Sequence, residues 1–340
     1  MASTLRWGIL GTGNIARQFT VGQTPGSRNV LSAVGSRSAQ SAEQFAATHG
    51  LPRAYGSYEA LIADPAIDAV YLSLPNSLHH EWTIRSLRAG KHVLCEKPLA
   101  ANAAEAEEMF DVAERHGRVL AEAFMYRSHP LTRAVREVVG SGQIGELKLI
   151  RTSFCFRTTK IAGNIRFDAS LAGGALMDVG CYCLNFARHF AGAEPTGVHG
   201  FGHLHPSGVD DHASALLAFP GGPVATLSCG ITVQGDNTAY LCGSEGYVEI
   251  PVPWKPPRES AVYSVVRGTP PLMDGPVKGP AAAPPRQTHH VTAPGELYAL
   301  ESEDFAAAVL DGRPPALDRR DSVGNMRLLD ELRRQVGVKF

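Results

Sequence analysis

Two stretches of the sequence carry side chains suited to acid–base chemistry. Lys97 directly precedes Pro98 at the end of the apolar run HVLCE. Asp178, Tyr182 and Asn185 lie at i, i+4 and i+7 of a segment with helical periodicity, so we expect all three to project from one helix face. Such a face is costly in a core but suits a pocket for a polar ligand; on periodicity alone, a solvated helix surface fits equally well.

A glycine-rich turn near the N-terminus predicts a dinucleotide site. The letters GTGNIA (11–16) form a G-x-G-x-x-A pattern between an apolar run and a helical stretch. The first glycine allows a tight turn, the second lets backbone approach a pyrophosphate, and the helix presents its N-terminus to the anion. A purely structural glycine turn is the alternative. The expected contacts come from Gly11, Thr12, Gly13, Asn14 and Ile15.

The end of the second apolar run indicates which dinucleotide binds. In the letters VGSRS, Ser36 and Arg37 stand where NAD sites usually carry an acid that accepts a hydrogen bond from the ribose. A carboxylate would repel a 2′-phosphate, whereas a guanidinium group can bind it. We therefore expect NADP, with NAD possible if Arg37 is only a solvated turn residue.

The surrounding elements predict an α/β fold of two parts. LRWGIL, NVLSAVGS and IDAVYLSL lack polar alternation and are separated by helical stretches, which is typical of parallel strands buried on both faces. We expect an N-terminal Rossmann domain over 1–123. Longer alternating segments follow, and they predict a C-terminal α/β domain over 124–340 with an open, mostly antiparallel sheet for substrate binding and oligomerisation. The last helix could pack back on the Rossmann domain.

Two further stretches qualify this outline. Asn102 and Glu105 are placed as a capping box for the helical stretch AAEAEEMFDVAERH. The segment 251–294 holds eleven of the 23 prolines without a period, and we interpret it as a long surface excursion of the second sheet.

Composition narrows the class of partner. Lys and Arg (32) nearly balance Asp and Glu (33), so neither a nucleic-acid groove nor a basic membrane patch is indicated, and we expect a small-molecule partner. The N-terminus lacks a basic segment before a long apolar run, so we expect a cytoplasmic protein. His203, His205, His289 and His290 show no carboxylate at ligand spacing, and the six cysteines are scattered; we expect no metal site.

Several blocks together resemble the glucose–fructose oxidoreductase and inositol dehydrogenase superfamily (Gfo/Idh/MocA). They are GTGNIA, SLPNSLHHEWTIRSLRAGKHVLCEKPLA (73–100), EAFMYRSHP (122–130) and GGALMDVGCYCLNFARH (173–189). The tyrosine at 182, where other branches carry histidine, looks most like the branch of NADP-dependent D-xylose dehydrogenases and dimeric dihydrodiol dehydrogenases. The resemblance implies a homodimer or a dimer of dimers.

The resemblance also implies a reaction. Hydride passes between nicotinamide and a sugar hydroxyl or carbonyl, with an aldose such as D-xylose or a keto-sugar as substrate. A trans-dihydrodiol dehydrogenase, an NAD-dependent glycosidase of the same fold and a non-catalytic NADP-sensing regulator are the alternatives.

Roles follow for the reactive residues. Tyr182 would be the general base, because a nearby ammonium group favours the tyrosinate and lowers its pKa. Lys97 would tune Tyr182 and hold the substrate oxygen, and Asp178 would orient Lys97. In the alternative assignment Lys97 donates the proton itself. A cis Lys97–Pro98 bond, recurrent in this superfamily, would aim the ammonium at Tyr182 and the nicotinamide.

Weaker expectations concern the residues around this centre. His79 is either a neighbour of the nicotinamide or a structural imidazole, and the two arginines of EAFMYRSHP and NIRFD are either substrate contacts or interdomain salt bridges. The expected cofactor contacts beyond the glycine turn are Leu74, Pro75, Asn76, His79, Glu96 and Lys97. The expected substrate contacts are Asn185, Tyr126 and Arg166.

Overall fold

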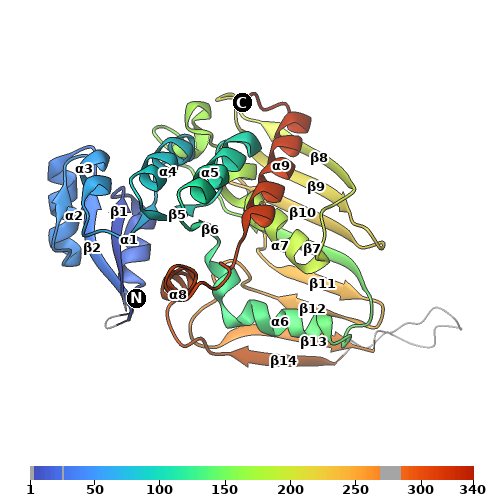
Figure 1. Cartoon of the computed structure of the whole chain (residues 1–340). Helices are drawn as coiled ribbons and strands as arrows, with labels where there is room; N and C mark the ends of the chain where they lie inside the picture. The colour runs from blue at the N-terminus through green and yellow to red at the C-terminus, as the bar shows by residue number, and fades with distance from the viewer. Residues whose placement is uncertain (1–3, 25–26, 269–284) are drawn as a thin grey trace, which may run out of the picture.

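The computed structural model describes residues 4–24, 27–268 and 285–340. Within these residues the strands form two sheets, one of six strands and one of eight. Figure 1 shows the first sheet with its blue and cyan helices on the left, and the second sheet, yellow to orange, on the right. An α/β fold with a Rossmann sheet and a second, mostly antiparallel sheet is confirmed.

The first sheet is parallel throughout, with strand order β3-β2-β1-β4-β5-β6. Its strands are β1 (Leu5–Leu10), β2 (Asn29–Gly35), β3 (Ala54–Tyr55), β4 (Ala69–Leu72), β5 (His92–Glu96) and β6 (Leu120–Ala123). Its helices are α1 (Asn14–Val21), α2 (Ala39–His49), α3 (Tyr58–Ala63), α4 (His79–Arg88) and α5 (Ala103–Arg115). The strand order reverses between β1 and β4, and ligands of such sheets bind in the crevice at that point.

The second sheet has the order β14-β13-β12-β11-β7-β10-β9-β8, and every described pairing is antiparallel except that of β7 with β10. Its strands are β7 (Leu147–Cys155), β8 (Gly197–Leu204), β9 (Asp210–Ala218), β10 (Val224–Gly230), β11 (Ala239–Gly243), β12 (Gly246–Ile250), β13 (Ala261–Arg267) and β14 (Arg286–Val291). Helices pack on one face of it: α6 (Pro130–Gly140), α7 (Cys181–Ala191) and α9 (Arg319–Val336).

The C-terminal helices join the two halves. α8 (Leu297–Asp311) packs on the first sheet, where the Phe305 ring lies 5.2 Å from that of Trp7 between centroids. α9, red in Figure 1, lies between α5 and β8. The Asp330 carboxylate on α9 accepts a hydrogen bond of 2.8 Å from the backbone N–H of Ala103, the first residue of α5. The last helix therefore contacts α5 of the first half.

A π-helical turn interrupts the helix expected near 175–190. Short helical turns also occur at η1 (Asn76–Leu78), η2 (Met125–Ser128), η3 (Ile165–Phe167) and η4 (Ala169–Leu171). The π turn η5 spans Leu176–Gly180 and precedes α7 directly. Gly174, before it, has φ of 118° and packs against the Asp210 side chain, which accepts the N–H of Leu176 at 2.7 Å. Because a π turn adds a residue, side chains before and after it no longer keep the i, i+4, i+7 relation.

The proline-rich stretch is partly regular. Its described portions supply β14, an edge strand of the second sheet, and its neighbour β13, and residues 269–284 lie outside the described residues. Trp254 turns inward and is 3% exposed. The expectation of a surface excursion is therefore wrong for Trp254 and the two strands.

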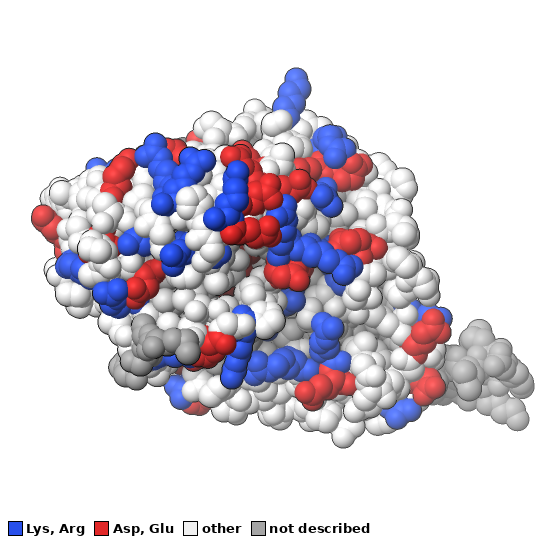
Figure 2. Space-filling view, in the orientation of Figure 1, with Lys and Arg blue, Asp and Glu red and all other residues white. Residues whose placement is uncertain are grey.

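Surface charge is mixed on the face in view: Figure 2 shows acidic and basic side chains interspersed over it. Among the described residues, no helix is long and apolar enough to cross a membrane.

Candidate active site

The glycine turn opens onto the crevice between β1 and β4. Gly11 has φ of 103°, and a Cβ there would lie 3.1 Å from the Ser73 carbonyl oxygen, so only glycine fits. A Cβ added to Gly13 would meet nothing within 4 Å. α1 begins at the next residue, Asn14, and no side chain caps its first N–H groups. This geometry fits a pyrophosphate. Asn14 and Gly13 are exposed, and Thr12 and Ile15 are half-buried.

The end of β2 fits a 2′-phosphate. Ser36 is buried, and its hydroxyl accepts a hydrogen bond of 3.3 Å from the Ser38 N–H. Arg37 is exposed, and within the described residues it makes no ion pair. A guanidinium group without an acidic partner remains available to an anion.

The residues after β4 tie the crevice to the second domain. Leu74 is buried, and Pro75 and Asn76 are half-buried. The Asn76 side-chain amide donates a hydrogen bond of 2.9 Å to the Ala172 carbonyl, which lies just before Gly173 in the second domain. Asn76 therefore fixes the relative position of the two site walls, and direct cofactor contacts by these three residues stay a prediction.

His79 is fully buried and holds two backbone segments together. Its Nδ1 lies 2.9 Å from the Pro98 carbonyl oxygen and its Nε2 lies 2.8 Å from that of Leu74. Burial lowers the pKa of His79. Both ring nitrogens are engaged with backbone, so of the two alternatives the geometry supports a structural imidazole. It fixes the turn that carries Lys97.

Lys97 enters the site from the end of β5 and meets Asp178. The Lys97–Pro98 peptide bond is cis, as expected. Nζ of Lys97 donates to the Asp178 carbonyl oxygen at 2.7 Å and lies 3.4 Å from its carboxylate Oδ1. Nε of Arg166 donates to the other carboxylate oxygen at 2.5 Å. Asp178 therefore orients two cations on its two oxygens, and only 15% of the Lys97 side chain is exposed.

Electrostatics keep this cluster ionised. Burial opposes the charge on Lys97, but the Asp178 carboxylate outweighs it and holds the pKa of Lys97 above its usual value. Burial likewise opposes the charge on Asp178, and Lys97 and Arg166 outweigh it, so the pKa of Asp178 is lowered. Glu96 is buried and accepts a hydrogen bond from the Tyr71 hydroxyl, and burial raises its pKa. Lys97 is an ammonium group at neutral pH.

Tyr182 differs from the expectation in its ionisation. Nζ of Lys97 lies over its ring, 5.0 Å from the centroid, while the hydroxyl donates to Sδ of Met125 at 3.4 Å. The residue is 4% exposed, and burial raises its pKa well above the usual value. The expectation that Lys97 lowers the pKa of Tyr182 is therefore wrong, because burial dominates and the ammonium group faces the ring and not the hydroxyl.

Contrary to the expectation, Asn185 and Tyr126 do not line the site. Both are fully buried, and the Tyr126 hydroxyl donates to Oδ1 of Asn185 at 2.6 Å. Nη1 of Arg127 donates to the same oxygen at 3.0 Å and to Asp321 on α9 at 2.7 Å. The π turn explains the difference, since it rotates Asn185 away from the face that Asp178 occupies. These residues bind α7 to α9, and Arg127 is a salt-bridge residue.

The sequence reasoning missed Trp254 and Lys255. The Trp254 ring lies 6.0 Å from that of Tyr182 and stacks on Phe154, and its Nε1 donates to the Ser153 carbonyl at 2.8 Å. Nζ of Lys255 donates to the side-chain oxygen of Gln18 on α1 at 3.2 Å. The sequence feature that could have revealed this contact is Trp254 itself, because a large aromatic ring in a proline-rich stretch usually packs against other side chains.

The histidines also correct an expectation. His203 has a carboxylate partner, Asp211, which it shares with His212. The β8–β9 hairpin pairs His203 directly opposite His212, so ligand spacing along the sequence did not reveal the cluster. A hairpin prediction from the letters HLHPSGVDDH, with a Pro-Ser-Gly turn, would have found it.

Two family models cover most of the chain. The model described as an oxidoreductase family with an NAD-binding Rossmann fold matches residues 5–124. The model of the GFO/IDH/MocA C-terminal domain matches residues 132–249. The chain belongs to the Gfo/Idh/MocA oxidoreductase family. The suspected superfamily is thus confirmed, and with it a nicotinamide dinucleotide as cofactor and the class of dehydrogenases.

Members of this family with known activities align over nearly the whole chain. Trans-1,2-dihydrobenzene-1,2-diol dehydrogenase of Mus musculus is 36% identical, covering 99% of this chain and 98% of that protein. D-xylose 1-dehydrogenase (NADP(+)) 2 of Haloferax volcanii is 36% identical, covering 96% of each. A 3-ketoreductase from Actinomadura kijaniata, solved with NADP and TDP-benzene, has a TM-score of 0.86 at 31% identity and covers 98% of each chain.

Proposed function

We propose that the protein is an NADP-dependent oxidoreductase acting on a sugar. It would oxidise an aldose such as D-xylose at the anomeric carbon, or reduce a keto-sugar in the reverse sense. The observation that carries the proposal is the Lys97 ammonium group, held by Asp178 at the mouth of the cofactor crevice. The D-xylose dehydrogenase and the 3-ketoreductase among its relatives support the substrate class.

The cofactor choice depends on Arg37. Its exposed guanidinium group at the end of β2 suits a 2′-phosphate, and the expected acid is absent from that position. Gly11 and Gly13 leave room for the pyrophosphate at the N-terminus of α1. When bound, the nicotinamide supplies or accepts the hydride.

Lys97 is the residue that we assign to the substrate oxygen. Two of its N–H bonds point to the carbonyl and carboxylate oxygens of Asp178, and the described residues provide no partner for the third. That third N–H can donate to a carbonyl oxygen and stabilise the charge that develops there during reduction. In oxidation the neutral amine form of Lys97 would accept the hydroxyl proton while the hydride passes from carbon to the nicotinamide. Of the two assignments left open by the sequence, this geometry favours direct proton transfer by Lys97.

Tyr182 then serves mainly to position Lys97. Its buried ring supports the ammonium group and excludes water from one side of it. A role as general base stays a prediction, and it requires the hydroxyl to leave Met125. Replacing Tyr182 by Phe separates the two roles. General catalysis by the hydroxyl predicts a loss of roughly 10²–10⁴ in turnover, whereas a positioning ring predicts nearly unchanged turnover.

A dihydrodiol is the second candidate substrate. The rings of Phe154 and Trp254 lie beside Tyr182 and form an apolar wall that suits an unsaturated carbon ring. The mouse dihydrodiol dehydrogenase supports this candidate. An NAD-dependent glycosidase and a non-catalytic regulator are less well supported, because Arg37 favours NADP and the Lys97–Asp178 pair is intact.

A substrate panel tests the proposal. Purified protein is assayed with NADP and with NAD against aldoses, keto-sugars and a trans-dihydrodiol, following the absorbance of reduced nicotinamide. The proposal predicts steady formation of NADPH with an aldose, or its consumption with a keto-sugar. Turnover with the dihydrodiol alone would select the second candidate. Tight NADP binding without any turnover would indicate a regulator and refute the enzyme.

We also propose that the open face of the second sheet is a homodimer contact, since it exposes Phe201 (84%) and Leu216 (54%). Light scattering on the wild type and on Phe201→Asp tests this, and a monomeric wild type would refute it. The cytoplasmic location stays a prediction from the sequence.

A further inference from the structure

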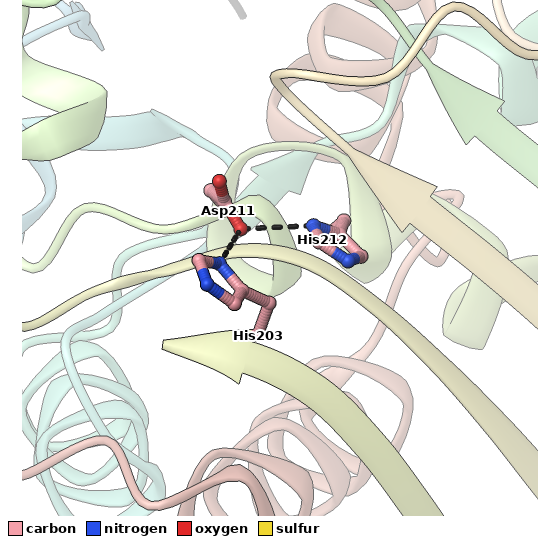
Figure 3. A group of neighbouring side chains, drawn as sticks. All are labelled: His203, Asp211 and His212. Atoms are coloured by element: carbon pink, nitrogen blue, oxygen red, sulfur yellow. Dashed lines mark hydrogen bonds and ion pairs between the residues drawn. The ribbon is translucent and has the colours of Figure 1, made fainter. Parts of the chain in front are cut away.

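Three polar side chains converge on the outer face of the β8–β9 hairpin. His203 stands opposite His212 in the strand register, and the register shifts directly after His203, which leaves Asp211 beside both rings. Oδ1 of Asp211 lies 2.9 Å from Nδ1 of His203 and 2.9 Å from Nδ1 of His212. Figure 3 shows the carboxylate between the two imidazoles.

The cluster lies on the side of the sheet that the helices leave open. At Gly200 of β8 the side-chain position faces α9, because a Cβ added there would meet Leu332. His203 is an odd number of residues away, so its side chain points away from that helix. The side chains of His203 and His212 are 57% and 47% exposed, whereas that of Asp211 is 9% exposed. In a single protomer, an ion in solution can therefore reach both imidazoles.

The donor set matches a transition metal. One donor atom of each residue lies within 4.8 Å of the other two, so a single ion could contact all three. Two imidazole nitrogens with one carboxylate oxygen are ligands typical of Zn²⁺, Cu²⁺ or Ni²⁺, whereas Mg²⁺ and Ca²⁺ prefer oxygen alone. The Thr232 hydroxyl donates to the other Asp211 oxygen at 3.1 Å and so orients the carboxylate. Such supporting hydrogen bonds accompany protein metal sites.

We propose that His203, Asp211 and His212 bind one divalent transition-metal ion, zinc above all. The ion fastens β8 to β9 beside the turn of the hairpin, and water completes its coordination. Each imidazole binds the ion through Nδ1 and carries a proton on Nε2. The three ligands lie on the face of the second sheet away from its helices, so we assign the ion no part in hydride transfer.

Metal titration of untagged protein tests the proposal. The full chain is stripped with a chelator, titrated with Co²⁺ while its absorption spectrum is followed, and then titrated with Zn²⁺ in competition. His203→Ala, His212→Ala and Asp211→Asn remove one ligand each. His199→Ala is the matched control, because His199 is another exposed histidine of β8, four residues away. Thr232→Val leaves the three ligands in place.

The proposal predicts one ion per chain in the wild type and in His199→Ala. Loss of a ligand should weaken binding at least about 100-fold, and Thr232→Val should weaken it about 10-fold. Zinc should raise the melting temperature of the wild type and the control but not that of the ligand variants. A cooperative melting transition in each ligand variant shows that the variant folds. Equal affinity in His203→Ala, His212→Ala and the control would overturn it. So would a cobalt–thiolate absorption band, which would place the ion on cysteine.

Discussion

The main expected effect of removing the Asp178 carboxylate is a lower pKa of Lys97. Asp178→Asn keeps the backbone carbonyl that accepts the 2.7 Å hydrogen bond from Nζ, so the lysine stays in place. It removes the charge at 3.4 Å that holds the pKa of Lys97 up. Arg166 then remains as a neighbouring cation, and the largest opposition to burial is gone, with Glu96 still acting against it.

The size of the effect follows from the geometry. An opposite charge within about 4–6 Å shifts a pKa by about 1–3 units. The Lys97 pKa should therefore fall by about 1–3 units in Asp178→Asn, which corresponds to about 1.4–4 kcal/mol in favour of the neutral amine. Burial and Arg166 act on Lys97 in both proteins, so only the loss of the Asp178 charge enters the difference.

The assay is the pH dependence of kcat for carbonyl reduction with NADPH. Reduction needs the ammonium form, so the rate falls as pH rises through the Lys97 pKa. In the wild type this fall lies above the usual pKa of lysine, and in Asp178→Asn it should move to lower pH. Arg166→Gln is the matched control, because it removes a cation and should not move the fall downward. Superimposable profiles of the wild type and Asp178→Asn would refute the reasoning.

Further predictions concern the cofactor, buried acid and aromatic wall. Arg37→Glu should weaken NADP binding about 10–100-fold by fluorescence titration and leave NAD binding nearly unchanged; an equal loss for both would contradict the 2′-phosphate assignment. Burial raises the pKa of Glu122 from 4.5 to about 8, so its folded form holds a proton that the unfolded chain loses above pH 4.5. The free energy of unfolding of the wild type should therefore decline as pH rises from 4.5 to about 8. Urea unfolding should show that Glu122→Gln becomes more stable relative to the wild type over this range, and a difference that is constant with pH would contradict this. Trp254→Ala should cost about 3–5 kcal/mol in urea unfolding, because its ring is buried. Val252→Ala, an exposed neighbour, should stay within about 0.5 kcal/mol, and equal losses would contradict the packing account.

The glycine turn and its place in the sheet could be predicted from the sequence because their signals are local. GTGNIA lies in one turn, and the strand before it fixes where that turn opens. Arg37 follows β2, the neighbouring strand of a parallel sheet, so strand order alone brings it to the same edge. The meeting of Lys97 with Asp178 needed the family resemblance, because 81 residues separate them along the chain.

The other half could not be predicted for a physical reason. A period of 3.6 residues holds only while the helix stays α-helical, and the π turn before α7 breaks it, which removed Asn185 from the site. Burial determined the pKa of Tyr182, and burial is a property of the packed fold. Trp254 and the His203–Asp211–His212 cluster likewise depend on contacts between segments that the sequence shows as separate.

The most direct test of the central claim is the effect of Lys97→Met on hydride transfer. Turnover of the best sugar substrate and the NADP dissociation constant are measured on wild type and variant side by side. Loss of a group that meets the substrate oxygen predicts a fall in kcat of about 10²–10⁴, with little change in NADP affinity. Unaltered turnover would contradict the assignment of Lys97 and, with it, the proposed active site.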